Sequence, residues 1–153
     1  MSLLKTDHLG HRFPDGSLAL EGVSFSVEPG EFVVVAGKNG SGKTVLMLHL
    51  NGLLKPTEGV VLYRDEPVGK NLALVRQRIG LVFQDPDNQL IGQTVAEDVA
   101  FGPENLGLPL DEIRSRVEES LKVLDIKHLR SKRPSALSGG EKRKAALAGI
   151  LAM

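Results

Sequence analysis

The spacing of hydrophobic and polar positions predicts strands in the first half of the chain and helices in the second. Apolar side chains recur through residues 18–27 on a mostly alternating pattern, which predicts a strand. Residues 31–36 are a short apolar run rich in β-branched side chains, as is typical of a buried strand in a parallel sheet. Residues 59–64 predict a further strand, and residues 79–83 form a third apolar run.

Helical patterns separate and then follow these runs. Helices are expected at residues 43–54 and, more briefly, at 72–78. Thr94 and Glu97 have the spacing of a capping box and open a helix that Gly102-Pro103-Glu104-Asn105 should break. Residues 111–124 carry apolar side chains at helical spacing with charges between them, and Ser138 precedes a final helix over 141–153. We therefore expect an α/β fold with a β-rich N-terminal part, a partial parallel sheet and a helical subdomain.

The length and composition limit the classes of protein. The 153 residues correspond to one domain, in which we expect an antiparallel β part plus a phosphate-loop core at 1–84, a helical subdomain at 85–136, and a second motif with the last helix at 137–153. Lys+Arg and Asp+Glu both number 19, so the net charge is zero and a nucleic-acid partner is not expected. The absence of cysteine excludes disulfides and thiolate metal sites.

No segment reads as a membrane anchor. The N-terminus has no long apolar core and does not resemble a signal peptide. The longest apolar run, residues 145–153, is far shorter than the roughly 20 residues needed to cross a bilayer. If the protein serves a membrane, we expect it to act from the surface through a partner.

The strongest chemical signal is a complete phosphate-loop pattern, G-x-x-x-x-G-K-[ST], between the 31–36 run and the following helix. Glycines let successive amides face one concavity, and the positive end of the helix points at the same place. The ammonium group of Lys43 suits the β- and γ-phosphates, and the Thr44 hydroxyl suits Mg²⁺. The alternative is a glycine-rich turn that binds nothing, which the flanking strand and helix disfavour. The nucleotide-binding residues predicted here are Gly37, Lys38, Asn39, Gly40, Ser41, Gly42, Lys43 and Thr44.

A second motif, Leu137-Ser138-Gly139-Gly140-Glu141, prepares another helix N-terminus for an anion. Ser138 is a good N-cap, and the two glycines leave backbone amides uncovered. Taken alone, these five residues are better explained as an ordinary Ser-capped helix. Their occurrence downstream of a phosphate loop reverses that balance.

Together these motifs resemble the ABC transporter ATPase family. Residues 137–141 are similar to its signature motif, and Gln84 to its Q-loop glutamine, which would serve Mg²⁺ and the attacking water. Phe13 stands in the place of the aromatic residue that stacks on adenine; the alternative is a core or edge-strand aromatic. The strings at 49–59, 82–89 and 99–107 sharpen the likeness to the energy-coupling-factor branch, which includes cobalt and nickel importers.

Three positions depart from the family pattern. Glu141 stands where Gln is usual, Lys144 where Arg is common, and Val45 where Ser or Thr is frequent. None of these changes removes a phosphate-binding group. The carboxylate of Glu141 does place a negative charge where it could weaken a composite nucleotide site.

The resemblance implies an ATP-binding subunit at the cytoplasmic face of the membrane, with ATP and Mg²⁺ as cofactors. Its partners would be a second nucleotide-binding subunit, identical or sister, and integral membrane transport subunits that take up a metal ion or a vitamin. ATP on one phosphate loop would be covered in trans by residues 137–141 of the other subunit. A rival interpretation is a module that binds nucleotide but cannot turn it over. An ABC ATPase of translation or DNA repair is disfavoured, because there is no basic surface or coiled-coil insertion.

The family's hydrolytic residues follow the signature motif, and no apolar strand ending in Asp-Glu is found after it. Asp65-Glu66 precedes Gln84, which is the wrong order, and is expected to form a turn. His49 and His128 are expected to be structural or solvated rather than a switch histidine. We therefore expect the C-terminal part of the domain to be missing and the chain to be a fragment or truncated product of a longer ATPase.

Overall fold

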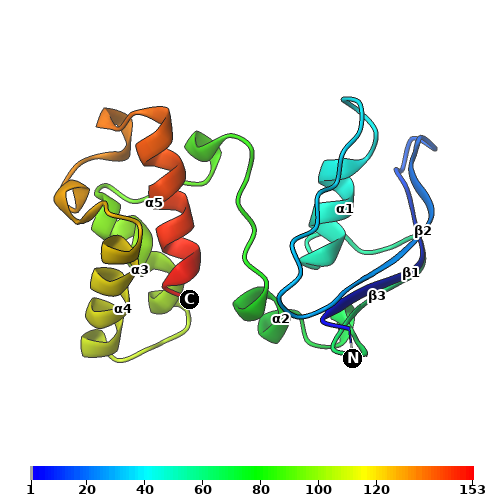
Figure 1. Cartoon of the computed structure of the whole chain (residues 1–153), viewed down its shortest axis with the longest axis horizontal. Coiled ribbons are helices and arrows are strands. Elements are labelled where there is room, and N and C mark those ends of the chain that lie inside the picture. The colour runs from blue at the N-terminus through cyan, green and yellow to red at the C-terminus, as the bar shows by residue number, and fades with distance from the viewer. Residues whose placement is uncertain (1) are drawn as a thin grey trace. The chain divides into compact units, whose positions relative to one another are not determined.

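The computed structural model describes residues 2–153. Met1, the first residue of the segment expected not to be a signal peptide, lies outside the described residues. The chain divides into two compact units, Met1–Ile79 and Gly80–Met153, and each is described by itself (Figure 1). Among the described residues, no helix has the length and apolar character needed to span a bilayer.

The first unit is built on a four-stranded antiparallel sheet in the order β2-β1-β3-β4. The strands are β1 (Leu4–Arg12), β2 (Leu18–Val27), β3 (Glu58–Tyr63) and β4 (Glu66–Pro67). The strands expected at 18–27 and 59–64 are confirmed within one residue, and Asp65 lies in the expected turn with a φ of 64°. Strand β1 was not foreseen, because charged and polar residues interrupt its apolar pattern. Its pairing with both β2 and β3 nevertheless places it in the middle of the sheet.

Two helices complete this unit. Helix α1 (Lys43–Leu50) follows the glycine loop, and α2 (Leu72–Arg78) follows the short 3-10 turn η1 (Val68–Lys70). Helix α1 ends four residues before the expected boundary, because Gly52 adopts a left-handed conformation with a φ of 71°. The core joins the sheet to both helices through Leu9, Leu20, Leu46, Val61, Val68 and Val75.

The strand expected at residues 31–36 is wrong for the described chain. Residues 31–38 have no strand hydrogen bonding, and the side chain of Phe32 is 91% exposed and that of Val34 72% exposed. The apolar run at 79–83 also forms no strand. A strand exists only through its neighbours, and no segment within residues 2–153 pairs with either run. The parallel part of the expected sheet is therefore not formed here, and the described sheet is antiparallel throughout.

The second unit is helical. Its helices are α3 (Val95–Asn105), α4 (Leu110–Val123) and α5 (Gly139–Leu151), which lie side by side in Figure 1. Short 3-10 turns, η2 (Pro86–Asn88), η3 (Lys127–Leu129) and η4 (Pro134–Ala136), connect them. The helices share one core, and α4 contributes Ile113, Val117 and Leu121 to it. The amphipathic pattern of residues 111–124 and the Thr94 cap, which accepts from the amide of Glu97, are confirmed.

The break expected over residues 102–105 comes only at the last of them, because α3 continues through Pro103 and ends at Asn105. Pro103 is fully buried, and a Cβ on Gly102 would lie 2.6 Å from Cγ of Met153. Gly102 therefore allows a close approach of the end of the chain to α3. Burial of this surface offsets the hydrogen bond that Pro103 cannot donate.

Candidate functional site

The phosphate-loop residues form a glycine-dependent curl that opens helix α1. Gly40 and Gly42 have φ values of 80° and 83°, a region that glycine occupies without steric cost. Gly42 is the N-cap of α1, so the helix begins at Lys43. Gly37 lies close to Ser41, since a Cβ on Gly37 would stand 2.8 Å from the Ser41 hydroxyl oxygen. The sequence pattern thus produces a tight loop whose shape depends on its glycines.

Lys43 folds back over this loop. Its ammonium group donates to the carbonyl oxygen of Gly37 at 2.9 Å and to that of Lys38 at 2.7 Å. An ammonium group has three donors, so one remains for a ligand. The positive charge therefore lies over the concavity, where a phosphate group would be received.

The remaining groups of the loop face solvent. Residues 37–41 and Thr44 are exposed, and the Thr44 hydroxyl makes no side-chain hydrogen bond within residues 2–153. The first amides of α1 have no acceptor in their own helix, as at every helix N-terminus. An exposed hydroxyl beside free amides fits a bound Mg²⁺ and its phosphate, because both magnesium and phosphate ligate through oxygen.

The turn between β1 and β2 carries Phe13. Its amide donates to the carbonyl oxygen of Ser17 at 2.9 Å, and the guanidinium of Arg12 donates to the carbonyl oxygen of Gly16 at 2.9 Å. The Phe13 side chain is 38% exposed, so one part of the ring is available to a ligand. The same turn leads into Ala19, whose carbonyl oxygen would lie only 2.5 Å from a Cβ on Gly42. The turn and the phosphate loop are thereby packed together within one unit.

Two histidines connect the β1–β2 hairpin to helix α1. His49 on α1 and His11 on β1 are 1% and 8% exposed, and their ring nitrogens Nε2 and Nδ1 are 3.1 Å apart. Of the two alternatives expected for His49, structural or solvated, the structure shows the first: the residue is buried and hydrogen-bonded. Burial lowers the pKa of His49, so its ring is neutral near pH 7. His11 is not predictable as a partner of His49 from the sequence, because a histidine on an unrecognised strand gives no signal of what it will contact.

The second motif begins helix α5 in the other unit. Ser138 is its N-cap, and the Ser138 hydroxyl and the Glu141 carboxylate form a reciprocal capping box. The amide of Ser138 donates to the Glu141 carboxylate at 2.7 Å, which lowers the pKa of that carboxyl. Leu137 is buried, whereas Gly139 and Gly140 are exposed. The charge of Glu141 is therefore held at the start of its own helix.

Gln84 lies in the same unit, in a segment that side chains hold in place. The Gln89 amide group accepts from the amide of Phe83 at 3.0 Å and donates to the carbonyl oxygen of Leu81 at 3.3 Å. After Gln84, the Asp87 carboxylate in η2 forms an ion pair with Lys142 of α5. Gln84 itself is exposed. The roles predicted for Gln84 and for residues 137–141 stay predictions, because they lie in a different unit from the phosphate loop.

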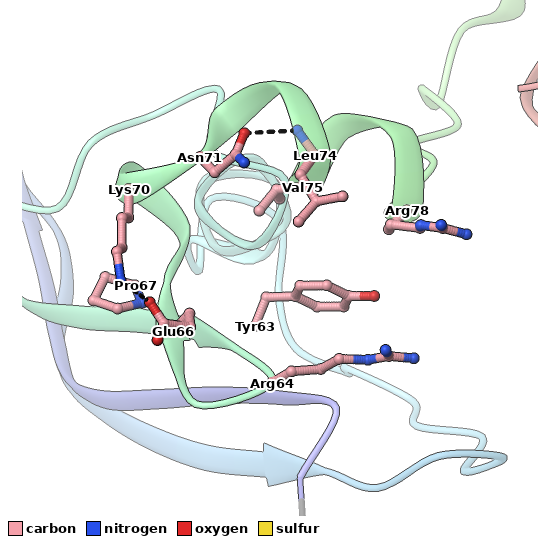
Figure 2. Close-up of a pocket in the computed structure, with 9 residues that line it drawn as sticks. All are labelled: Tyr63, Arg64, Glu66, Pro67, Lys70, Asn71, Leu74, Val75 and Arg78. Carbon is pink, nitrogen blue, oxygen red and sulfur yellow. Dashed lines mark hydrogen bonds and ion pairs between the residues drawn. The ribbon is translucent and has the colours of Figure 1, made fainter.

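A further pocket of the first unit contains none of the predicted site residues. Its volume is about 560 Å³, and Figure 2 shows the Arg64 and Arg78 side chains on either side of Tyr63. The Arg64 guanidinium carbon lies 5.6 Å from the centre of the Tyr63 ring. The pocket is lined by Tyr63, Arg64, Glu66, Pro67, Lys70, Asn71, Leu74, Val75 and Arg78.

A glycine curl over a helix N-terminus, with a lysine folded across it and a hydroxyl beside it, defines the class of P-loop nucleotide-binding domains. Comparison with known proteins identifies the family within that class. A family model described as ABC transporter matches residues 20–153. The chain belongs to this family, and the resemblance seen in the sequence is confirmed.

Individual relatives agree with this assignment. The energy-coupling factor transporter ATP-binding protein EcfA of Methanocaldococcus jannaschii is 49% identical over all of this chain and 56% of its own length. The protein of the same description from Methanoculleus marisnigri is 51% identical over 100% of this chain and 56% of its own. The chain thus spans a little over half the length of these curated relatives.

A solved structure shows the same fold. The structure of cbiO1 from Clostridium perfringens, described as part of the ABC transporter complex cbiONQ, matches with a TM-score of 0.87 and 42% identity. The match covers 99% of this chain and 61% of cbiO1. The ABC-type fold class expected from the sequence is therefore confirmed, although residues 31–36 form no strand.

Proposed function

We propose that this chain is the nucleotide-binding part of an energy-coupling-factor ATPase, which binds Mg-ATP and couples its hydrolysis to import of a metal ion or a vitamin. The observation that carries the proposal is the position of the Lys43 ammonium over the curl of residues 37–42. The curl supplies amides, the helix supplies its positive end, and Lys43 supplies a full positive charge. A triphosphate is the ligand whose charge and length suit all three.

Each part of the nucleotide has a proposed partner. The loop amides and Lys43 bind the β- and γ-phosphates, and the Thr44 hydroxyl is a ligand of Mg²⁺. Phe13 stacks on adenine with the part of its ring that is exposed. Magnesium, when bound, would neutralise charge on the phosphates, and Gln84 would orient the attacking water.

Residues 137–141 act in trans in this proposal. A second nucleotide-binding subunit would close on the ATP with the N-terminus of its α5 helix, so that the γ-phosphate lies between two helix N-termini. ATP would stabilise the closed pair because only that pair satisfies the charge of the γ-phosphate, and hydrolysis would reopen it. The sequence similarity to two EcfA proteins and the match to cbiO1 support membrane transport subunits as further partners, at the cytoplasmic face of the membrane.

The first test is nucleotide binding by the chain itself. Isothermal titration with ATP and Mg²⁺ should give one site, and Lys43→Ala should weaken binding at least about tenfold, because a charge-assisted contact to phosphate is lost. Lys55→Ala is the matched control, since Lys55 is an exposed lysine outside the loop. Absence of ATP binding by folded protein, or equal loss in both variants, would refute the proposal.

Hydrolysis and coupling require a second assay. A complete ATPase that carries these residues should release phosphate in the presence of its membrane subunits, and Gln84→Ala should reduce the rate while ATP binding persists. Transport that continues unchanged after Lys43→Ala would contradict the coupling.

A further inference from the structure

The buried pair His11–His49 has no part in the proposed chemistry, although it lies between the strand that leads to Phe13 and the helix that begins with Lys43. His49 belongs to α1, the helix that begins with Lys43 and Thr44, and His11 belongs to β1, which leads into the turn that carries Phe13. The ring centroids of the two histidines are 4.7 Å apart with an interplanar angle of 69°. Both rings are almost fully removed from solvent.

The hydrogen bonds fix which nitrogens carry protons. Nδ1 of His49 lies 2.7 Å from the carbonyl oxygen of Val45, which can only accept, so this nitrogen is protonated. In a neutral ring, Nε2 of His49 is then an acceptor. Nδ1 of His11, 3.1 Å away, must donate to it. The hydrogen bonds therefore run in one direction: His11 donates to His49, and His49 donates to the backbone of α1.

The His11 ring also contacts Phe13. The His11 and Phe13 rings meet edge to face, with centroids 4.9 Å apart and an interplanar angle of 84°. Such contacts favour one relative orientation of two aromatic rings. The rotamer of Phe13 is thus tied, through two histidines, to the helix that carries the phosphate-binding lysine.

We propose that His11 and His49 are positioning residues that hold Phe13 in the orientation in which it stacks on the adenine of bound ATP. This inference rests on the proposed function and extends it to two residues that do not touch nucleotide. A partly exposed ring without such a support would have to be ordered by the ligand, and ordering one side chain weakens binding. Removing the support should therefore weaken ATP binding about three- to tenfold, while contacts to the triphosphate are kept.

The experiment compares two ligands in the same protein. ATP uses both the ring and the phosphate loop, whereas inorganic tripolyphosphate uses the loop alone. The affinities of both, each with Mg²⁺, are measured for wild type and for two His11 variants. His11→Asn keeps a donor near the position of Nδ1 but removes the ring, and His11→Phe keeps the ring but removes the donor. Both variants should lose ATP affinity and keep tripolyphosphate affinity within about twofold.

A double-mutant cycle with Phe13→Ala identifies the route of the effect. If His11 acts through Phe13, the His11 variants should change ATP affinity by less than about twofold when Phe13 is already absent. His8→Asn is the control on the same strand, because His8 is exposed and has a φ of 48° that asparagine tolerates. It should leave both affinities unchanged.

A measurement on the wild-type protein covers the case in which the variants do not fold. Nitrogen-15 spectra of the imidazole groups should show a proton on Nδ1 of both histidines and none on Nε2 of His49, and the His11 signals should shift with ATP but not with tripolyphosphate. Unchanged ratios of ATP to tripolyphosphate affinity in the folded variants, or His11 signals that ignore ATP, would overturn the inference. Failure of tripolyphosphate to bind wild type would instead refute the phosphate loop itself.

Discussion

Gly40 and Gly42 offer a matched test of how the phosphate loop is built. Both are exposed or half-buried residues of one loop, and their φ values, 80° and 83°, are almost equal. Their surroundings differ. A Cβ added to Gly40 would meet nothing within 4 Å, whereas a Cβ added to Gly42 would lie 2.5 Å from the carbonyl oxygen of Ala19 and 2.9 Å from a methyl group of Leu20.

The magnitudes follow from these two facts. An alanine in the left-handed region costs roughly 1–2 kcal/mol, and this cost applies equally to Gly40→Ala and Gly42→Ala. Only Gly42→Ala must also displace the β1–β2 hairpin, because backbone oxygen cannot rotate away as a side chain can. Overpacking of this kind adds about 1–3 kcal/mol. The total is about 2–5 kcal/mol for Gly42→Ala, against about 1–2 kcal/mol for Gly40→Ala.

Urea denaturation of the two variants, followed by circular dichroism, gives the free energies of unfolding. Gly42→Ala should have the lower midpoint, and its free energy of unfolding should be lower than that of Gly40→Ala by at least about 1 kcal/mol. Tripolyphosphate affinity should fall in parallel, because Gly42 is the N-cap of α1, the helix whose N-terminus faces the loop. Equal midpoints, or a lower midpoint for Gly40→Ala, would show that the loop does not pack on the hairpin.

Three further predictions concern stability. Burial holds the pKa of His49 below its ordinary value of 6.5, so the unfolded chain binds the proton more readily than the folded one. The free energy of unfolding should therefore decline as the pH falls below 6.5. Urea midpoints at several pH values should show this decline, and His49→Gln should make it shallower. Lys142→Met and Asp87→Asn each remove the ion pair between these two residues and should lower the free energy of unfolding by up to about 1 kcal/mol. A double-mutant cycle should return a coupling energy, whereas strictly additive effects would mean that the ion pair contributes nothing to stability. Ser138→Ala removes the N-cap of α5 and should lower the free energy of unfolding by about 0.5–2 kcal/mol. Ser135→Ala, which lies outside α5, should match wild type in the same urea denaturation.

Local chemistry made parts of this protein readable from the sequence. The phosphate loop was predictable because glycine, lysine and threonine at fixed spacing act through backbone geometry that depends on few neighbours. The caps at Thr94 and Ser138 were predictable for the same reason, since each bond spans three residues. The amphipathic period of α4 was equally local, because it reports only which face of the helix is covered.

Other features depended on contacts between distant residues. The run at 31–36 has a strong strand pattern, yet it forms no strand, because strand structure requires a partner that the described chain does not provide. Pro103 lies inside a helix because burial of the surrounding surface outweighs one missing hydrogen bond. In both cases the local sequence preference did not decide the structure. Residues 31–36 lack a strand to pair with, and packing keeps Pro103 inside the helix.

The sequence by itself determined the phosphate-loop motif, because a loop of glycines followed by lysine and threonine sets the backbone amides, the helix start and the positive charge within eight neighbouring residues. Only the tertiary structure decided that His11 and His49 meet and that His11 touches Phe13, since residues from a strand and a helix come together by folding. The physical reason is range: covalent geometry acts between neighbours, whereas burial and ring contacts act between any residues that the fold places side by side.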